Sequence, residues 1–210
     1  MQALLHPCYL PNIANFAVIA QRDVRWEIHD NFQKQTSRNR AYICTDRGAL
    51  MLNIPIIHVG KDHGRQKYKD VKVDNDYKWQ RQHWRTIQTA YRSSPFFEYY
   101  EDDIAPLYTN GYNFLLDYNL QFITTICDCL QIAMPEAQTD MFELRPQNVL
   151  DARFLVDVKK KLPLHQPVYQ QVFGDRHGFI PNASVLDLLF NEGTNALGYL
   201  KMLTLDFLDA

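Results

Sequence analysis

The sequence predicts an α/β fold with a mainly parallel sheet, a β-α-β opening and a helical C-terminal half. Apolar runs of strand length at residues 3–5 and 24–28 enclose a stretch with helical spacing at residues 13–20. Adjacent parallel strands require a crossover connection, and a helix supplies one. Longer stretches of helical spacing follow at residues 76–92 and 114–130.

Length and composition indicate a single globular domain. The chain has 210 residues, of which 46% are hydrophobic and 22% charged, the balance of a soluble globular protein. We expect one domain over residues 1–210, with a helical subdomain at about 76–132. The apolar runs are shorter than the roughly 20 residues that span a bilayer, and the first residues lack a signal-peptide pattern. The sequence therefore predicts a cytoplasmic protein without a membrane span.

The expected elements follow from local signals. Asn12 is a suitable cap for the first helix, and the segments on either side of Asp46-Arg47-Gly48 predict a β-hairpin over residues 40–54. Residues 149–164 fit a helix or a strand. The remaining expected elements are a loop at 57–66, a short strand at 69–73, a helix from Ser94 or Pro95, a strand at 168–173, a helix at 185–191 capped by Ser184, and a last helix after Gly193.

The charge is unevenly distributed along the chain. The formal net charge is −2, yet residues 22–92 hold 15 Lys and Arg against 8 Asp and Glu. A basic half in a nearly neutral chain suggests an anionic ligand, such as a phosphate, a nucleotide or a nucleic acid. The alternative is that these cations pair with the acidic half.

The loop from His6 to Pro11 is the first candidate site. A loop between the carboxyl end of a parallel strand and a helix N-terminus is a common anion site in α/β folds. His6 is the candidate catalytic residue, because it can donate to a phosphate oxygen and stabilise developing charge. Tyr9 is a candidate substrate contact. The alternative is a turn that the two prolines rigidify.

A dense polar segment follows the second strand and is the second candidate. If the first two strands are adjacent and parallel, this segment lies at the same sheet edge as His6. Asp30 is suited to act as a general base or a metal ligand, and guanidinium groups can hold phosphates. The alternative is a solvated loop. The candidate phosphate- and substrate-binding residues of the segment are Gln33, Lys34, Arg38, Asn39 and Arg40.

Two further residues leave alternatives open. His83 shares a helix face with Trp79 and Ile87, so it is either a substrate contact or a packed core histidine. Asp187 lies in an apolar stretch, where it either pairs with an arginine or belongs to the site. The four cysteines have no C-x-x-C spacing, so we expect free thiols and no metal site. Walker A, G-x-G-x-x-G, H-E-x-x-H and EF-hand patterns are absent from the sequence.

These segments, taken in order, resemble the WbqC-like protein family of bacteria, over about residues 4 to 200. Cys8 and the stretch Asn12–Phe16 depart from the family pattern, and residues 134–164 match it poorly. The matching pieces are His6-Pro7-x-Tyr9-Leu10-Pro11, Asp23-Val24, Asp30 with Gln33 and Asn39-Arg40, Ile54-Pro55, Trp79-x-x-x-His83-x-x-x-Ile87-x-x-x-Tyr91, Ser94-Pro95-Phe96-Phe97, and Tyr169-x-Gln171-Val172-Phe173 through Gly193.

The resemblance implies a role in bacterial surface-polysaccharide (O-antigen) or amino-sugar biosynthesis. The opening also resembles the Rossmann-like nucleotidylyltransferase (HUP-like) arrangement, although the second His of the H-x-G-H signature is missing. We therefore expect a transferase that binds a nucleotide or nucleotide-sugar and transfers an acyl, aminoacyl or nucleotidyl group. ATP or another nucleotide with Mg²⁺ is the cofactor that this expectation allows.

Two alternatives to an enzyme stay open. A non-catalytic binding or assembly protein would use the basic N-terminal half to dock an acidic partner. Nucleic-acid binding is the weaker alternative, because the aromatic residues between the basic ones suit stacking but no RNP or helix-turn-helix pattern is present. The sequence does not indicate an oligomeric state.

Overall fold

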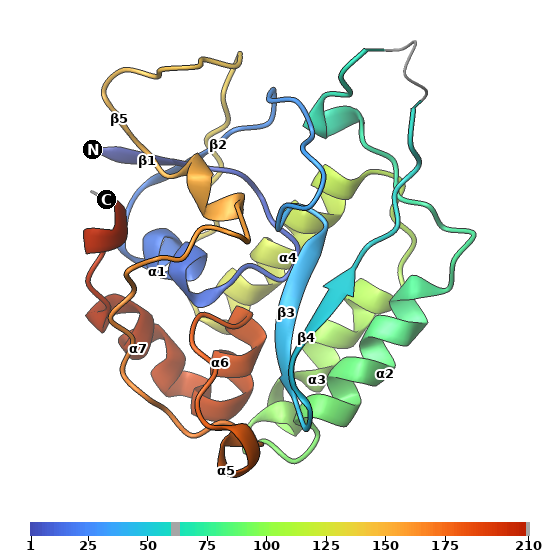
Figure 1. Cartoon of the computed structure of the whole chain (residues 1–210), viewed down its shortest axis with the longest axis vertical. Coiled ribbons are helices and arrows are strands. Elements are labelled where there is room, and N and C mark those ends of the chain that lie inside the picture. Colours follow the sequence, from blue (N-terminus) through green and yellow to red (C-terminus); the bar gives the residue numbers. More distant parts are fainter. Residues whose placement is uncertain (60–63, 209–210) are drawn as a thin grey trace.

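The computed structural model, which describes residues 1–59 and 64–208, is a mixed α/β structure (Figure 1). A parallel sheet has the strand order β2-β1-β5, with β1 at Gln2–Leu5, β2 at Val24–Trp26 and β5 at Val149–Asp151. Both neighbours of β1 run parallel to it. The central strand β1 is buried except at Gln2, and Val24 and Trp26 of β2 are buried, whereas the residues of β5 are partly or fully exposed.

Helix α1 (Ile13–Gln21) connects β1 to β2. The side chain of Asn12 caps it by accepting a hydrogen bond from the backbone N–H of Asn15 at 3.0 Å. This confirms the cap expected from the sequence. All three strands end at the same edge of the sheet, so the loops that follow them start close together.

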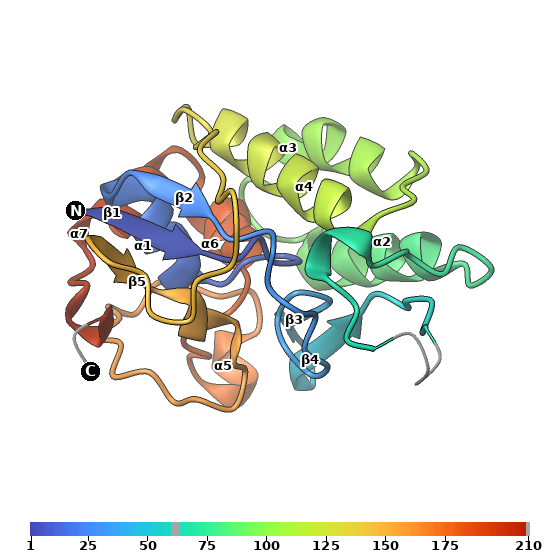
Figure 2. The same ribbon diagram turned by 90° about the horizontal axis from the view of Figure 1, so that it is seen from above.

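The second sheet is an antiparallel hairpin of β3 (Arg40–Thr45) and β4 (Gly48–Asn53). It confirms the hairpin predicted around Asp46-Arg47-Gly48. Gly48 has a φ of +95°, in the region that favours glycine, and it closes the tight turn. In Figure 2, the hairpin and the parallel sheet occupy different parts of the molecule.

Three helices follow the hairpin in the chain: α2 (Trp79–Tyr91), α3 (Phe97–Ile104) and α4 (Leu115–Cys129). They correspond to the three helices expected in this region. Figure 2 shows them grouped on one side of the molecule. The separate subdomain expected at about 76–132 stays a prediction.

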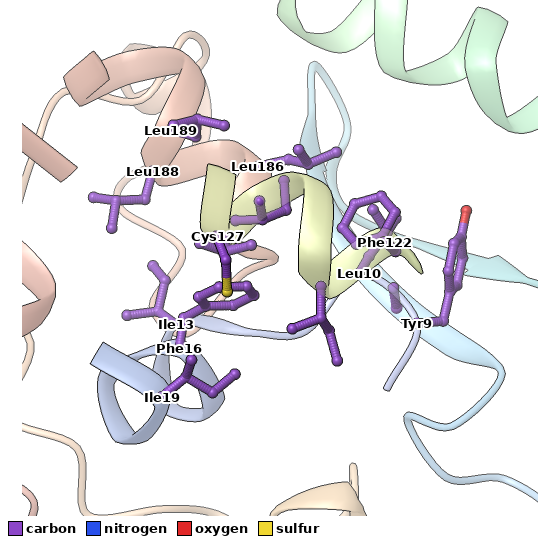
Figure 3. Close-up of a cluster of buried hydrophobic side chains, with 14 of the residues drawn as sticks. Tyr9, Leu10, Ile13, Phe16, Ile19, Phe122, Cys127, Leu186, Leu188 and Leu189 are labelled. Carbon is purple, nitrogen blue, oxygen red and sulfur yellow. The ribbon is translucent and has the colours of Figure 1, made fainter. Parts of the chain in front are cut away.

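Helix α6 (Val185–Glu192) carries the C-terminal part of the core. The hydroxyl oxygen of Ser184 caps it, and Gly193 ends it with a φ of +55°. Helix α7 (Ala196–Met202) packs against α1. Figure 3 shows side chains of α1, α4 and α6, among them Phe16, Phe122 and Leu186, meeting in one buried cluster.

Several expectations about individual elements were wrong. Residues 69–73 do not form a strand, because Tyr68–Asp70 is a 3-10 helix. Residues 168–173 are not a strand, and their side chains contact α6 through Tyr169 and Gln171 instead. The stretch 149–164 is neither one helix nor one strand but β5 followed by a 3-10 helix at Arg153–Val156. The loop expected at 57–66 includes residues 60–63, which lie outside the described residues.

The predicted fold class is confirmed in part. The mixed α/β class and the small parallel sheet are present, whereas the Rossmann-like assignment stays a prediction. A helical C-terminal half is not confirmed, since residues 130–173 contain one short strand and one 3-10 helix among irregular structure. Short helix α5 (Gly174–His177) follows that region.

Candidate functional site

The loops after β1 and β2 meet at the carboxyl edge of the parallel sheet. The backbone N–H of Glu27 donates to the Leu5 carbonyl at 2.7 Å, and the N–H of Tyr9 donates to the Ser37 carbonyl at 3.0 Å. The Tyr68 hydroxyl donates to the Pro7 carbonyl at 2.7 Å and so holds the first loop from the other side. Ligands of open α/β sheets bind at this edge of the strands.

The two loops bring His6, Asp30 and Arg38 into direct contact. Nη2 of Arg38 donates to Oδ2 of Asp30 at 2.6 Å and lies 2.7 Å from Nε2 of His6. Nε2 of His6 is 3.3 Å from the same Asp30 oxygen. Residues up to 32 positions apart in the sequence thus form one cluster, which we call the His6 cluster.

His6 is neutral at pH 7. Burial lowers its pKa from 6.5 to about 4, and the nearby Asp30 carboxylate opposes this only in part. Nδ1 lies 3.2 Å from the Glu27 carbonyl oxygen, which accepts but cannot donate, so Nδ1 carries the proton. Nε2 then presents a lone pair to the Arg38 guanidinium. The positive charge of the cluster is therefore on Arg38, not on His6.

Asp30 is ionised and balances the charge of Arg38. Burial alone would raise the pKa of Asp30, but the hydrogen bond and the positive charge of Arg38 outweigh this and hold the pKa well below its usual value of 3.8. Arg38 is almost fully buried, and its guanidinium also donates to the Asn31 carbonyl at 2.8 Å and lies over the Tyr68 ring. A buried guanidinium requires such a partner, because an unpaired buried charge is costly.

The third strand adds a second ion pair to the same edge. Arg153 follows β5 and contacts both carboxylate oxygens of Asp151, at 2.8 and 2.7 Å. Its other terminal nitrogen lies 3.6 Å from the buried Glu27 carboxylate. Sequence reasoning missed Asp151 and Arg153, although polar residues directly after the apolar pair Val149-Leu150 gave the same signal as those after β1 and β2.

These groups line a cavity of about 370 Å³, which we call the His6 cavity. It contains three carboxylates and two guanidinium groups, and both guanidiniums are already paired with carboxylates. The excess of cations over residues 22–92 of the sequence is therefore not reproduced in the lining of this cavity. Its lining residues are His6, Asp30, Gln33, Arg38, Phe142, Asp151, Arg153, Phe154, Val156 and Asp157.

Lys34, Asn39 and Arg40 lie on a different cavity of about 410 Å³, together with Phe32, Asn53, His58, Asp74 and Tyr77. We call it the Arg40 cavity. Nε of Arg40 donates to Oδ1 of Asn53 at 3.3 Å, and among the described residues neither Lys34 nor Arg40 forms an ion pair. Because Gln33 and Arg38 face the first cavity, segment 30–40 separates the two.

Tyr9 and His83 are part of the core and line neither cavity. The Tyr9 hydroxyl is 2.8 Å from Nδ1 of His83, and the two rings are stacked with centroids 5.6 Å apart. Burial lowers the pKa of His83 to about 4. His83 is therefore buried and packed against Tyr9, in the way the packed-histidine alternative describes.

Asp187 lies in a separate buried cluster, where no arginine of the described residues pairs with it. Its Oδ2 accepts from the Tyr169 hydroxyl at 2.5 Å and from Nε2 of Gln171 at 2.8 Å. Burial raises its pKa. The four cysteines are free thiols. In the described part of the chain, no group of three or more His, Cys, Asp or Glu side chains is arranged to hold a metal ion.

Within residues 1–59 and 64–208, no helix combines the length and the apolar character needed to cross a membrane. No solved structure matches the chain at a significant level. The chain is similar to an uncharacterized protein of Mycobacterium tuberculosis, with 29% identity over 230 residues, covering 95% of this chain and 96% of that protein.

The model of the WbqC-like protein family matches residues 6–165. The match begins at His6 and includes both candidate loops, the hairpin, helices α2 to α4 and the β5 region. It also includes residues 134–164, which resembled the family poorly, and stops before Tyr169. Because the match covers most of the sequence, the chain belongs to the WbqC-like protein family.

Proposed function

We propose that this chain is a transferase of bacterial surface-polysaccharide or amino-sugar biosynthesis that acts on a nucleotide or nucleotide-sugar. The transferred group is acyl, aminoacyl or nucleotidyl. The observation that carries the proposal is the pair of cavities on the two sides of segment 30–40. One contains the paired His6 cluster, and the other carries Lys34 and Arg40, which form no ion pair with any carboxylate of the described residues.

The Arg40 cavity suits the anionic part of the substrate. Arg40 can bind a phosphate with two N–H groups, and Lys34 adds a point charge. Phe32 and Tyr77 line the same cavity and offer aromatic surfaces to a nucleobase. Family membership supports a role near polysaccharide synthesis.

The His6 cavity suits a neutral or cationic acceptor. Asp30, Asp151 and Asp157 present carboxylate oxygens that accept hydrogen bonds from sugar hydroxyl groups or pair with an ammonium group. In the free protein, Arg38 occupies the lone pair of His6 Nε2. A bound anionic group that draws Arg38 away would free this lone pair to accept the proton of the attacking hydroxyl or amine.

Ligand binding tests the proposal. Thermal unfolding is measured with a panel of nucleotides and nucleotide-sugars, each up to 10 mM. A ligand at 100 times its Kd stabilises by about 2.7 kcal/mol, which raises the Tm by about 5–10 °C for a chain of this size. Arg40→Gln should weaken binding about tenfold, since it removes a charge-assisted hydrogen bond. Arg25→Gln, at an exposed position on β2, is the control.

Activity then separates binding from chemistry. Asp30→Asn should keep nucleotide affinity and lose turnover, assayed at a temperature at which far-UV circular dichroism shows it folded. The absence of a shift with every phosphate ligand, or equal weakening in Arg40→Gln and Arg25→Gln, would refute the proposal.

A non-catalytic docking function is the second candidate. Lys67, Lys69 and Lys72 are exposed and form no ion pair with a described carboxylate. If the chain docks an acidic partner through them, co-purification should fall with salt and with Lys→Glu changes at these positions. It should survive Asp30→Asn, because the His6 cavity would take no part.

A further inference from the structure

A further cavity lies away from both parts of the candidate site. It has a volume of about 640 Å³ and is bounded by the tip of the β3–β4 hairpin, helix α2 and the start of α5. In Figures 1 and 2 the hairpin lies between α2 and α5. We call it the Arg85 cavity. Its lining residues are Thr45, Asp46, Arg47, Ala49, Leu50, Arg85, Thr86, Thr89, Ala90, Phe173 and Arg176.

Three arginines that are exposed to solvent line this cavity. Arg47 comes from the hairpin turn, Arg85 from α2 and Arg176 from α5. Among the residues that the structure describes, none of the three guanidinium groups forms a hydrogen bond or has a carboxylate within ion-pair distance. In the His6 cavity, by contrast, each arginine is bound by a carboxylate.

Only one carboxylate, that of Asp46, lines the Arg85 cavity in the described chain, so its lining carries a net positive charge. Like charges that converge on one cavity repel each other and favour an anion between them. Guanidinium groups are suited to phosphate because their N–H groups match its oxygen atoms in pairs.

Besides three threonines, the lining has an apolar part. Ala49, Leu50, Ala90 and Phe173 contribute to it, and Leu50 is 41% exposed to solvent. The guanidinium carbon of Arg176 lies 5.3 Å from the centroid of the Phe173 ring. An apolar surface next to a cationic one fits a ligand that has both an anionic group and an apolar group.

The hairpin and α5 are joined directly, so the arginines are held on a defined frame. Nε2 of His177 lies 2.8 Å from the Thr45 carbonyl oxygen, and His177 directly follows Arg176. Thr45 pairs with Gly48 at the tip of the hairpin, and Arg40 pairs with Asn53 at its other end. At about 3.3 Å per residue the two ends are roughly 17 Å apart, so the Arg85 and Arg40 cavities are separate.

We propose that the Arg85 cavity binds a phosphate ester whose substituent is apolar or aromatic. The phosphate contacts Arg47, Arg85 and Arg176, and the substituent packs on Leu50, Ala90 and Phe173. This site does not depend on the function proposed for the His6 and Arg40 cavities, since no lining residue is shared.

Two probes test the site and distinguish a soluble ester from a lipid. The first is 1-naphthyl phosphate, titrated into the full chain and followed by its fluorescence polarisation. The second is a phosphatidylcholine vesicle with and without phosphatidic acid, assayed by co-sedimentation. Saturable binding of either probe is expected, with inorganic phosphate competing about tenfold more weakly than naphthyl phosphate because it lacks the apolar contact.

Variants locate the binding. Arg85→Gln and Arg176→Gln should each lower the affinity for the probe that the wild type binds by about tenfold, because each variant loses a charge-assisted hydrogen bond. Arg81→Gln is the matched control, because Arg81 is exposed on the same helix and does not line the cavity. Arg40→Gln should leave the affinity unchanged. The proposal is overturned if neither probe binds, if Arg85→Gln and Arg176→Gln bind like the wild type, or if Arg40→Gln abolishes binding.

Discussion

Replacing Asp30 by asparagine tests the electrostatic account of the His6 cluster most directly. The change keeps the shape of the side chain and removes its charge. In the wild type, Oδ2 of Asp30 accepts from Nη2 of Arg38 at 2.6 Å, and Arg38 is almost fully buried. The variant leaves this guanidinium inside the protein without a counter-charge.

The expected loss follows from the structure. The pKa of Asp30 is lowered from 3.8 to about 2, which at 1.36 kcal/mol per unit corresponds to about 2 kcal/mol of stability before solvent screening. Screening at the cavity mouth reduces this, whereas stranding a buried cation adds to it, and removing one partner of a buried pair costs about 3–5 kcal/mol. We expect Asp30→Asn to lower the free energy of unfolding by about 3 kcal/mol at pH 7.

The assay is urea denaturation followed by circular dichroism, with Asp151→Asn as the control. Asp151 binds Arg153 through both oxygen atoms, but its side chain is 41% exposed, so its loss should cost less than about 1 kcal/mol. Replacing Arg38 by methionine in the Asp30→Asn background should recover part of the stability, because it removes the stranded charge. Equal losses in the two aspartate variants, or no recovery in the double variant, would contradict this account.

The pH dependence of the same measurement has a defined sign. The folded pKa of Asp30 lies below its unfolded value, so its contribution is complete above pH 3.8 and is lost as the pH falls through about 2. The difference between wild type and Asp30→Asn should therefore shrink between pH 4 and 2.

Three further predictions follow from other parts of the fold. Burial lowers the pKa values of His6 and His83 to about 4, so between pH 6.5 and 4 only the unfolded chain binds these protons, and the free energy of unfolding should fall over this range. In urea denaturation, His83→Gln should make this fall smaller. A fall as large as that of the wild type would contradict the assignment. Gly193→Ala should destabilise the protein by more than about 2 kcal/mol in thermal unfolding, since Gly193 has a φ of +55° and an added Cβ would lie 2.5 Å from the Phe96 ring. In the same measurement Gly198→Ala should be neutral or stabilising, because an added Cβ there meets nothing within 4 Å. Tyr169→Phe should lower the free energy of unfolding by about 1–3 kcal/mol in chemical denaturation, because it removes the hydroxyl that donates to buried Asp187. The control is Tyr99→Phe, at an exposed position. An equal loss in the two variants would argue against a structural role for the Tyr169 hydrogen bond.

Much of the local structure could be predicted from the sequence. Asn12 and Ser184 as caps, the hairpin around Asp46-Arg47-Gly48 and the helices α2 and α4 depend on contacts between residues close in the chain. Local spacing and capping chemistry report such contacts. The residues at the ends of the first two strands were also recognisable, because strand ends of a parallel sheet share one edge.

The strand β5 and the site residues behind it were not predicted. Val149–Asp151 is three residues long, and it pairs with β1 across more than 140 positions of sequence. A strand this short has no periodicity to read, so only its partner identifies it. Asp151 and Arg153 reach the His6 cavity through that pairing alone.

The sequence by itself determined the family, the mixed α/β class, the caps and turns, and the polar segments at the ends of two strands. Only the tertiary structure decided how the charges are distributed among cavities. Pairing with Asp30 and Asp151 neutralises the arginines near His6. Arg40 and Arg85 line separate cavities, and neither forms an ion pair with a carboxylate in the part of the chain that the structure describes. The physical reason is that the effect of a charge depends on its nearest counter-charge and its burial, and both come from contacts between residues far apart in the chain.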